Sequence, residues 1–409
     1  MNRLIPVEEH LATVLSAVSD IGTERLPLAA SRGRILRESV HAAVDLPAFD
    51  NSAMDGFAVR HDDIADASAD HPVRLRVVAD LPAGTALDPP LGRGEAARIM
   101  TGSPLPTAAT AIVPFEDTVG GLADSLGDIE VTVAKPFGAH VRRRGEDAAA
   151  GDVVLEAGIL LGPLQTAAIA ASGVADVVVS RRPRVAVVST GSELVPPGTP
   201  LRRGQIPESN GELLEALALG AGADVVISAT VSDDDGGPRE VLEEAERLGA
   251  DVVVFSGGVS AGAYEVVKNT LGDVMSFTSV GMQPGKPQGF GRTLAGILLF
   301  GLPGNPVSAA VSFEVFVRPA LLTMQGATDH ARRVLTLPAA VGWRTPPGRA
   351  QYLPVVIDTT DPAAWRVTPA TSGGSHLAGG LGRAEAYAIV PAEVARVDPG
   401  DLVDVMLIS

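Results

Sequence analysis

The clearest pattern in this chain is a series of apolar runs that alternate with amphipathic segments in its second half. Runs such as Arg184–Ser189 and Asp251–Phe255 are continuously apolar, which is typical of strands buried on both faces of a sheet. Between them, residues 213–217 carry leucines at helical spacing directly after Ser209 and Asn210, a pair that favours the start of a helix. The alternation predicts an α/β fold with a doubly wound, mostly parallel sheet.

The rest of the chain is patterned more weakly. Residues 6–44 show helical periodicity, whereas the following hundred residues are rich in Gly, Pro and Asp and contain only short β-type runs. The C-terminal segment has short β runs broken by Pro and Gly, which favours a small β-barrel. We expect a helical or mixed N-terminal domain (1–44 plus 141–180), an inserted β-rich domain (45–140), an α/β domain (181–328) and a C-terminal β-barrel domain (329–409).

Composition excludes several classes of function. The 409 residues carry a net charge of −17, and a surface this negative repels DNA and RNA. The chain has no cysteine, which excludes disulfides, cysteine-ligated zinc and a thiol nucleophile. Neither a signal peptide nor an apolar run of about 20 residues, the length that spans a bilayer, is recognisable. We therefore expect a soluble, cytoplasmic protein with neither a membrane nor a nucleic acid as partner.

Three glycine-rich turns follow predicted strands, at Ser189–Leu194, Ser256–Ser260 and Gly301–Ser308. Glycine lets the backbone come close to a ligand, and a helix N-terminus behind it offers N–H groups and a positive dipole end. Because parallel strands end at the same sheet edge, the turns should meet in one anion pocket. The expected binding residues are Thr190, Gly191, Glu193, Gly257, Gly258, Ser260, Pro303, Gly304 and Asn305.

Charged residues lie next to these turns. Asp233 and Asp234 follow the second strand, and Glu265 follows the second glycine-rich turn. Hard oxygen ligands are those that Mg²⁺ takes, so we expect them to hold Mg²⁺ beside bound phosphates; solvated loop and surface carboxylates are the alternative interpretation. Lys286 stands between two prolines, which restrict the turn and favour an anion contact over an ordinary surface turn.

At these residues the chain resembles the MoeA family of molybdopterin molybdenumtransferases, which includes the E domain of gephyrin. The matching motifs run in family order across almost the whole chain: Asn51–Val59, Ile99–Pro104, Arg142–Asp147, Ser189–Leu194, Ser256–Ser260, Pro284–Pro287, Gly301–Ser308 and Gly374–His376. The resemblance implies an elongated homodimer with a MogA-like α/β domain. Its composite active sites would lie between this domain and the partner's inserted and barrel domains.

The resemblance also implies a reaction. Molybdate would be inserted into adenylyl-molybdopterin in a Mg²⁺-dependent step that releases AMP and gives the molybdenum cofactor. Contacts with a molybdopterin adenylyltransferase and with acceptor molybdoenzymes would follow from that role. The residues carried over are Asp55 and Thr101 as partner-subunit contacts, Lys286, Arg349 and Ser375 as anion contacts, and Glu265, Asp233, Asp234 and Lys286 as the catalytic set.

Two positions depart from the family pattern. Glu265 stands where an Asp is frequent, and Gln283 replaces a Lys, which removes a positive charge from any molybdate site. Two other functions therefore stay open at this point. One is a molybdopterin adenylyltransferase, which usually consists of an α/β domain alone. The other is a gephyrin-like interaction scaffold without catalysis.

Overall fold

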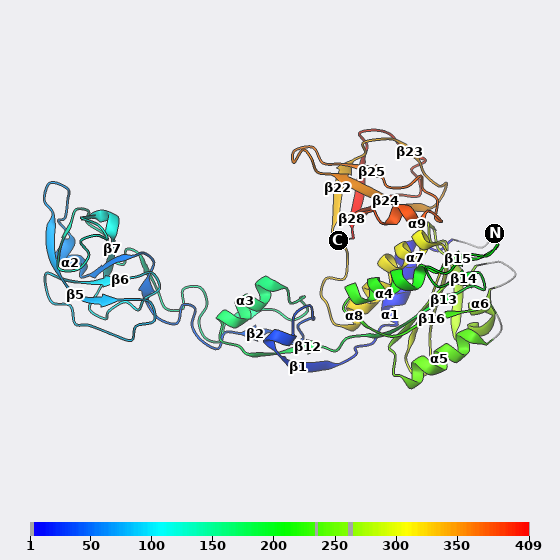
Figure 1. Ribbon diagram of the computed structural model, residues 1–409, viewed down its shortest axis with the longest axis horizontal. Coiled ribbons are helices and arrows are strands. Elements are labelled where there is room, and N and C mark those ends of the chain that lie inside the picture. Colours follow the sequence, from blue (N-terminus) through cyan, green and yellow to red (C-terminus); the bar gives the residue numbers. More distant parts are fainter. Residues whose placement is uncertain (1–3, 234–235, 261–264, 409) are drawn as a thin grey trace.

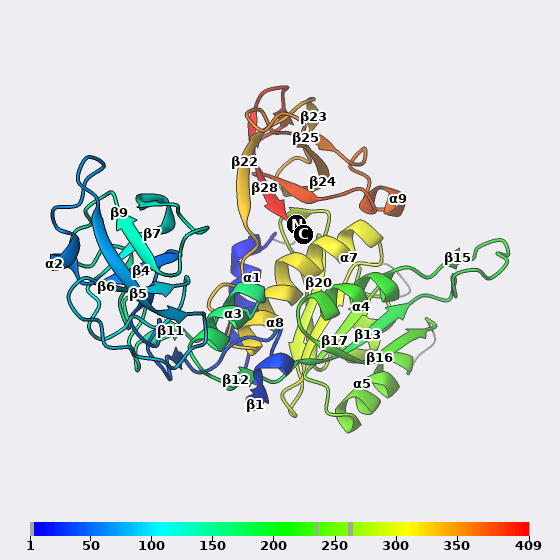
Figure 2. The ribbon, with the colours of Figure 1, turned by 60° about the vertical axis from the view of Figure 1, so that its left-hand side comes forward.

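The structure, a computed structural model, describes residues 4–233, 236–260 and 265–408. The molecule is elongated, with a small strand-rich unit at one end and a larger group of helices and strands at the other (Figure 1). Two chain segments connect these ends. A C-terminal group of strands lies against the larger group (Figures 1 and 2).

The α/β unit at the larger end consists of strands β13 (Arg184–Thr190), β16 (Asp224–Val231), β17 (Val252–Ser256), β18 (Met275–Ser279), β20 (Pro287–Arg292) and β21 (Leu298–Leu302), and of helices α4 (Asn210–Gly220), α5 (Gly237–Arg247), α6 (Val266–Leu271), α7 (Pro306–Ser312) and α8 (Arg318–Met324), with a π-helical segment η3 (Phe313–Val317) between the last two. The strand order is β16-β13-β17-β21-β20-β18. The first four strands are parallel, and the last two continue the sheet antiparallel.

Both faces of this sheet are covered, which explains the continuous apolar runs. Along β13, Val185 and Val187 pack on one face with α4, α7 and α8, whereas Ala186 and Val188 pack on the other face with α5 and α6. Successive side chains of a strand point to opposite faces, so a strand with two buried faces must be apolar at every position.

The segment from α7 to α8 is the buried core helix of this unit. By length and composition, Pro306–Met324 is apolar enough to cross a membrane, but 89% of that window is buried inside the protein. A helix that is hydrophobic all round can be buried in the core of a large protein. Its apolar character is explained by the sheet and helices that surround it.

The N-terminal elements are α1 (Val7–Ser16), β1 (Thr23–Pro27), a 3₁₀ turn η1 (Leu28–Ala30), β2 (Val40–His41), β3 (Asn51–Ser52), β10 (Val141–Arg142), β11 (Val153–Leu155), α3 (Pro163–Ala171) and β12 (Asp176–Ser180). They form three two-stranded antiparallel pairs: β1 with β12, β2 with β11, and β3 with β10. The chain therefore runs out to the far end of the molecule through β1, β2 and β3, and it returns antiparallel to them through β10, β11 and β12.

The expectation of a mostly helical segment over residues 6–44 is wrong beyond Ser16. Two short strands, Thr23–Pro27 and Val40–His41, and irregular backbone replace it, because Pro27 and the positive-φ Gly22 and Gly33 interrupt a helix and the partner strands lie far along the chain. Helix α1 also packs elsewhere than expected. Its buried Val7 and Val14 join the core of the α/β unit.

The inserted unit contains β4 (Gly56–Val59), α2 (His61–Ile64), β5 (Val73–Leu81), β6 (Glu95–Ile99), β7 (Ala111–Pro114), a 3₁₀ turn η2 (Phe115–Asp117), β8 (Thr118–Val119) and β9 (Asp128–Val131). Its six strands have the order β7-β4-β6-β5-β9-β8. Phe57 and Phe115 meet edge to face in its core, with ring centroids 5.2 Å apart.

The C-terminal unit contains β22 (Val334–Pro338), β23 (Trp343–Arg344), β24 (Ala350–Asp358), β25 (Arg366–Pro369), α9 (Ala378–Leu381), β26 (Ala386–Val390), β27 (Arg396–Val397) and β28 (Leu402–Leu407), and β19 (Met282–Gln283) adds to its edge. Strand pairing runs from β25 through β24, β26 and β28 to β22. A bridge between Ala339 and Val367 closes this path into a ring.

The buried histidine of α1 generates a testable prediction on stability. His10 is 6% exposed and lies edge-on to Phe316, with ring centroids 4.7 Å apart. Burial lowers the pKa of His10 from 6.5 to about 4. Between pH 6.5 and pH 4 the imidazole of His10 is protonated in the unfolded chain but neutral in the folded chain. The free energy of unfolding therefore falls as the pH falls through this range. The loss between pH 7 and pH 5 should be about 2 kcal/mol.

His10→Leu should remove this acid sensitivity, because leucine does not titrate. Urea unfolding at pH 7 and pH 5 measures the difference, and His71→Leu at an exposed position is the matched control. Equal losses of unfolding free energy in the wild type and the His10 variant would contradict a buried neutral imidazole.

Candidate active site

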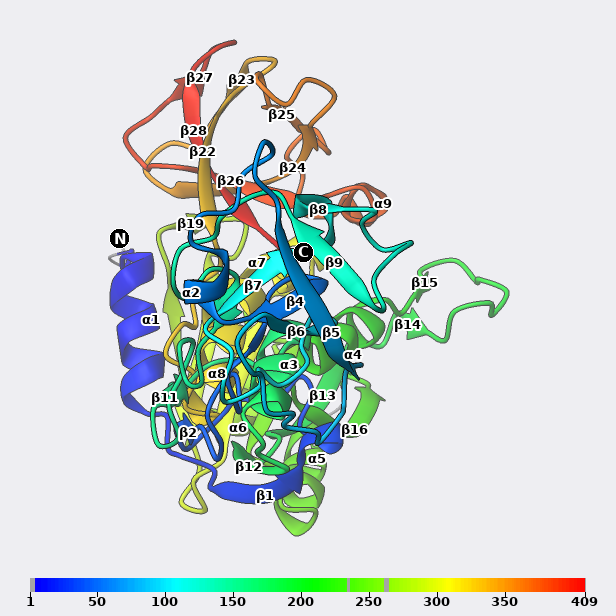
Figure 3. The ribbon, with the colours of Figure 1, turned by 90° about the vertical axis from the view of Figure 1, so that its left-hand side faces the viewer.

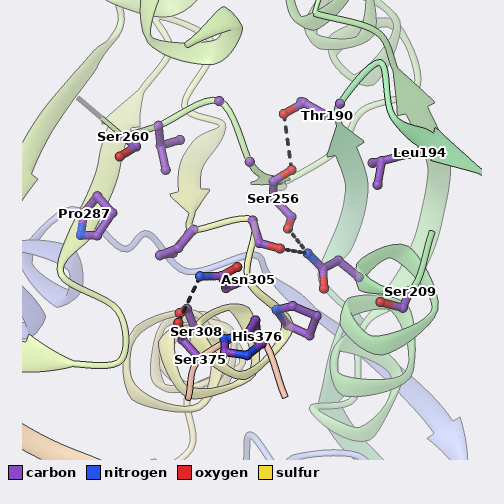
Figure 4. A pocket seen from close by; sticks show the side chains of 18 of the residues that line it. Thr190, Leu194, Ser209, Ser256, Ser260, Pro287, Asn305, Ser308, Ser375 and His376 are labelled. Atoms are coloured by element: carbon purple, nitrogen blue, oxygen red, sulfur yellow. Dashed lines mark hydrogen bonds between the residues drawn. The ribbon is translucent and has the colours of Figure 1, made fainter. Parts of the chain in front are cut away.

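A cavity of about 750 Å³ opens at the carboxyl ends of β13, β17 and β21. Figure 4 shows side chains from the three turns and from the C-terminal unit gathered around it. The described residues that line it include Thr190, Gly191, Glu193, Leu194, Ile206, Pro207, Glu208, Ser209, Asn210, Asp233, Ser256, Gly257, Gly258, Val259, Ser260, Glu265, Gln283, Gly285, Lys286, Pro287, Pro303, Gly304, Asn305, Pro306, Ser308, Ser375, His376 and Ala378.

The turn after β17 is packed tightly against the turn after β13. Gly257 has φ +97°, and a Cβ there would lie 2.7 Å from the carbonyl oxygen of Thr190. The Thr190 hydroxyl donates to the carbonyl oxygen of Ser256 at 3.3 Å (Figure 4). Only glycine fits this conformation and spacing without strain, which explains the first glycine of the motif.

The first turn does not lead directly into a helix. Strands β14 (Leu194–Val195) and β15 (Ile206–Pro207) pair in a projecting arm, and α4 begins only at Asn210 (Figures 2 and 3). The arm returns the chain to the cavity, where Glu208 accepts hydrogen bonds from the Ser189 hydroxyl at 2.8 Å and the Gly211 N–H at 2.7 Å. The start of α4 is thereby tied to the end of β13.

Asn210 joins the second and third turns. Its Nδ2 donates to the Ser256 hydroxyl and to the Gly304 carbonyl oxygen, both at 2.7 Å. The C-terminal unit closes the same side of the cavity, because Asn305 donates to the Ser375 hydroxyl at 2.9 Å (Figure 4) and the Val307 N–H donates to the Ser375 carbonyl at 3.2 Å.

Several amides that were expected to face an anion already have partners inside the chain. The Gly211 N–H is bound by Glu208, the Val307 N–H by Ser375, and the Ser260 N–H by Glu265 at 2.5 Å. Gly211 and Val307 lie in the first turns of α4 and α7, so these two helix N-termini present fewer open donors than expected, whereas Ser260 precedes α6. An incoming anion would have to displace carboxylates from two of the three amides.

The described lining is acidic. It contributes four carboxylates, from Glu193, Glu208, Asp233 and Glu265, against one lysine, Lys286. An anionic ligand in such a cavity needs a further positive charge, either from a cation or from another subunit. Lys286 itself is exposed at the cavity wall, which fits the expected anion contact.

Of the residues expected to hold a metal, Asp233 and Glu265 are described, and both line the cavity. Asp233 is fixed by Ser192, whose N–H donates to its carboxylate at 3.1 Å and whose hydroxyl accepts from its N–H at 3.0 Å. No group of three potential metal ligands is present among the described residues. Asp234 lies outside them.

Arg349 lies behind the lining and not in it. Its guanidinium donates to the Gln283 side-chain oxygen at 2.7 Å, and Gln283 lines the cavity. The glutamine thus holds the arginine of the C-terminal unit close to the wall. A lysine at position 283 would repel this arginine, whereas the neutral glutamine accepts its hydrogen bond.

Asp55 and Thr101 are brought together, but far from the cavity of their own chain. Both are exposed on the inserted unit at the opposite end of the molecule (Figure 1). Asp55 accepts from the Thr101 N–H at 2.6 Å and from its hydroxyl at 2.7 Å, and these bonds hold the pKa of Asp55 below its ordinary value. The Arg143 and Arg144 side chains of the basic run pair with Asp50 and Asp45.

The sequence therefore located the three turns that form this cavity. Every residue expected from the three turns lines it, together with Asp233, Glu265, Lys286 and Ser375. Gln283 and His376, which the sequence analysis named at the molybdate site and in the Gly374–His376 motif, also line the cavity. Sequence reasoning read Asn210 only as a helix cap and missed Glu208 as a lining residue. The side chains of these two residues contact segments that lie elsewhere in the chain, and the Ser209–Asn210 pair was the one local signal for them.

Three family models match the chain in succession. They are the MoeA N-terminal region (domain I and II) at residues 5–173, a probable molybdopterin binding domain at residues 186–323, and the MoeA C-terminal region (domain IV) at residues 336–408. The second of these spans all three turns of the cavity.

Curated relatives and solved structures agree with these matches. Molybdopterin molybdenumtransferase 2 of Mycobacterium tuberculosis is 42% identical over 402 residues, covering 96% of this chain and 97% of the relative. A molybdopterin molybdenumtransferase of Staphylococcus aureus is 38% identical and covers 80% and 77%. A molybdopterin biosynthesis MoeA protein of Pyrococcus horikoshii superposes with a TM-score of 0.79 at 32% identity, covering 100% of both chains. The chain therefore belongs to the MoeA family of molybdopterin molybdenumtransferases.

Proposed function

We propose that this protein inserts molybdenum from molybdate into adenylyl-molybdopterin, releases AMP and gives the molybdenum cofactor. The observation that carries this function is the near full-length match to a molybdopterin molybdenumtransferase, within which the three turns enclose one cavity. The match includes the N-terminal and C-terminal regions as well as the α/β unit. Neither an adenylyltransferase nor a scaffold is favoured by it.

The side chains of the cavity suit a reaction that depends on positioning and charge. Lys286 supplies a cation for phosphate or oxyanion oxygens, and the Ser308 and Ser375 hydroxyls supply neutral donors. Groups fixed before the substrate arrives stabilise developing charge without having to reorganise. Cleavage of the phosphoanhydride bond to AMP is the step that such groups would assist.

The experiment that tests the function mixes purified protein with adenylyl-molybdopterin, Mg²⁺ and molybdate and follows AMP release by chromatography. AMP should form only when molybdate is present. With molybdopterin, ATP and Mg²⁺ instead, no adenylyl-molybdopterin should accumulate. Its accumulation would identify an adenylyltransferase, and absence of AMP at saturating substrate would favour a scaffold.

We further propose that Mg²⁺ takes part, held by Asp233, Glu265 and substrate phosphate oxygens, with Asp234 a further candidate. Mg²⁺ is commonly bound by one or two carboxylates, waters and substrate phosphates, so two protein carboxylates beside a phosphate site fit it. The bound ion would neutralise phosphate charge in this acidic lining. Chelation with EDTA should stop AMP release and added Mg²⁺ should restore it; unchanged release would rule the metal out.

A composite site in a homodimer is the second part of the proposal. Asp55 and Thr101 lie at the end of the molecule opposite to their own cavity, so a second copy is needed to bring them to one. Large apolar side chains are exposed on the N-terminal unit between these ends: Leu164 is 80% exposed and Leu160 58%. Burial of this surface against a second copy would stabilise the dimer.

Subunit mixing tests the composite site. Asp55→Ala and Lys286→Ala should each be inactive as homodimers, because every site lacks one group. Refolded together, half of the dimers are mixed and carry one intact site of two, so about one quarter of wild-type activity should return. Mixing Asp55→Ala with Thr101→Ala is the control and should restore none. Failure of the first mixture to recover activity, despite proven subunit exchange, would place both groups in one chain's own site.

Lys286→Ala should weaken AMP and molybdate binding with little change in stability. The side chain is exposed, so its removal leaves no cavity, but a charged hydrogen bond to the ligand is lost; affinity should fall about tenfold. Calorimetry measures binding, and thermal unfolding measures stability. Lys268→Ala, at an exposed position of α6 outside the lining, should leave both unchanged. A large drop in melting temperature for Lys286→Ala would instead indicate a structural role.

A further inference from the structure

We propose that Asn210 is a positioning residue for the reaction: its side-chain amide holds the turns after β17 and β21 in the arrangement that the substrate requires. The inference rests on the proposed function, since it concerns the geometry of the same cavity. It assigns the residue a role through Ser256 and Gly304.

The contacts of Asn210 carry the argument. The residue is 9% exposed. Its Nδ2 donates two hydrogen bonds, one to the Ser256 hydroxyl and one to the Gly304 carbonyl oxygen, each at 2.7 Å. Those turns follow neighbouring parallel strands, and Ser256 is paired with Leu302 at their ends. After this last strand pair, one further backbone hydrogen bond joins the two turns, from the Gly257 N–H to the Leu302 carbonyl oxygen. Asn210 adds a side-chain connection between Ser256 and Gly304.

The residue is itself held in place from the other side. Glu208 binds both the Ser189 hydroxyl and the Gly211 N–H, which fixes the start of α4 to the end of β13. Ser256 receives a second bond from Thr190 through its carbonyl oxygen. Asn210 therefore connects α4, a helix reached only after the projecting arm, to the second and third turns, while Glu208 and Thr190 connect them to the first.

The chemistry of the side chain explains why an amide is needed. The Gly304 atom in this contact is a carbonyl oxygen, so its partner must donate a hydrogen, and the same group must also donate to or pair with the Ser256 hydroxyl. Asn210 Oδ1 is buried and has no hydrogen-bond partner among the described residues, which is an unfavourable arrangement. Capping of α4 does not explain why an asparagine stands at this position, because Ser209 occupies the cap position. The favourable contribution of the side chain lies in its N–H groups.

Displacement of these turns would reach the whole site. Gly304 is followed by Asn305, which binds Ser375 of the C-terminal unit, and Ser256 is followed by the glycine pair of the second turn. A misplacement of about 1 Å in such a site can cost about a hundredfold in rate. A change that misplaces these turns should therefore lower the reaction rate more than a change that only lowers the stability of the fold.

The test compares Asn210→Asp with a structurally matched control. Asp keeps the shape but replaces the two hydrogens with an oxygen that faces the Gly304 carbonyl. Gln325→Leu is the control, because Gln325 is also a buried amide whose Nε2 donates twice, to Ala221 and Leu321 carbonyl oxygens at 2.9 Å, outside the cavity lining. Both variants should lose melting temperature.

Only the Asn210 variant should change function. We expect kcat/KM for AMP release to fall about a hundredfold in Asn210→Asp and to stay within about twofold of wild type in Gln325→Leu. Asn210→Ala combined with Ser256→Ala should lose less than the product of the two single losses, because both remove the same link. If Asn210→Asp does not fold, Asn210→Ser, which keeps one donor, carries the test with a smaller loss.

The outcomes distinguish a failure of this inference from a failure of the proposed function. If wild-type protein releases no AMP, the proposed function fails, and AMP affinity measured by calorimetry then decides on Asn210: a drop of about tenfold for the neutral Asn210→Ala and none for Gln325→Leu supports positioning. If the wild type is active but the Asn210 variants behave like Gln325→Leu, or if the Asn210 and Ser256 effects multiply independently, the inference is overturned.

Discussion

Parallel pairing of β13, β17 and β21 is the interaction on which the arrangement of this protein depends. The three strands are buried on both faces, so the apolar side chains of each must find partners in two helical layers at once. That double requirement leaves little freedom in register. With the register fixed, the three strands end at one level, and the turns that follow them are forced into contact, as the approach of Gly257 to Thr190 illustrates.

The cavity that results has an unfavourable charge for its ligand. Four carboxylates face one lysine in the described lining, and several backbone amides are already bound within the chain. A protein of net charge −17 adds to this field. Binding of a phosphate or an oxyanion must therefore be coupled to a cation, to a second subunit or to the displacement of a carboxylate, and such coupling would make binding conditional on the complete assembly.

Local sequence patterns predicted the structure correctly where the consecutive residues of one strand or one turn determine it. The four parallel strands of the α/β unit, the glycine turns and Lys286 could be assigned because apolar runs and glycine positions are properties of consecutive residues, whereas the antiparallel β18 and β20 were not predicted. The helical assignment of residues 17–44 failed because those residues pair with strands more than a hundred positions away. Periodicity contains no information on such partners, and tertiary pairing overrode it.

The sequence by itself determined the family, the layered α/β core and the glycine-rich turns of the cavity wall, since motifs and hydrophobic spacing are encoded locally. Only the tertiary structure decided how the wall is held: that Asn210 joins two turns, that Glu208 fixes the start of α4, that Gln283 holds Arg349, and that Asp55 and Thr101 lie away from their own cavity. These are contacts between segments distant in the chain. Their existence depends on the packing of whole units, because a hydrogen bond forms only where folding has already placed donor and acceptor within reach.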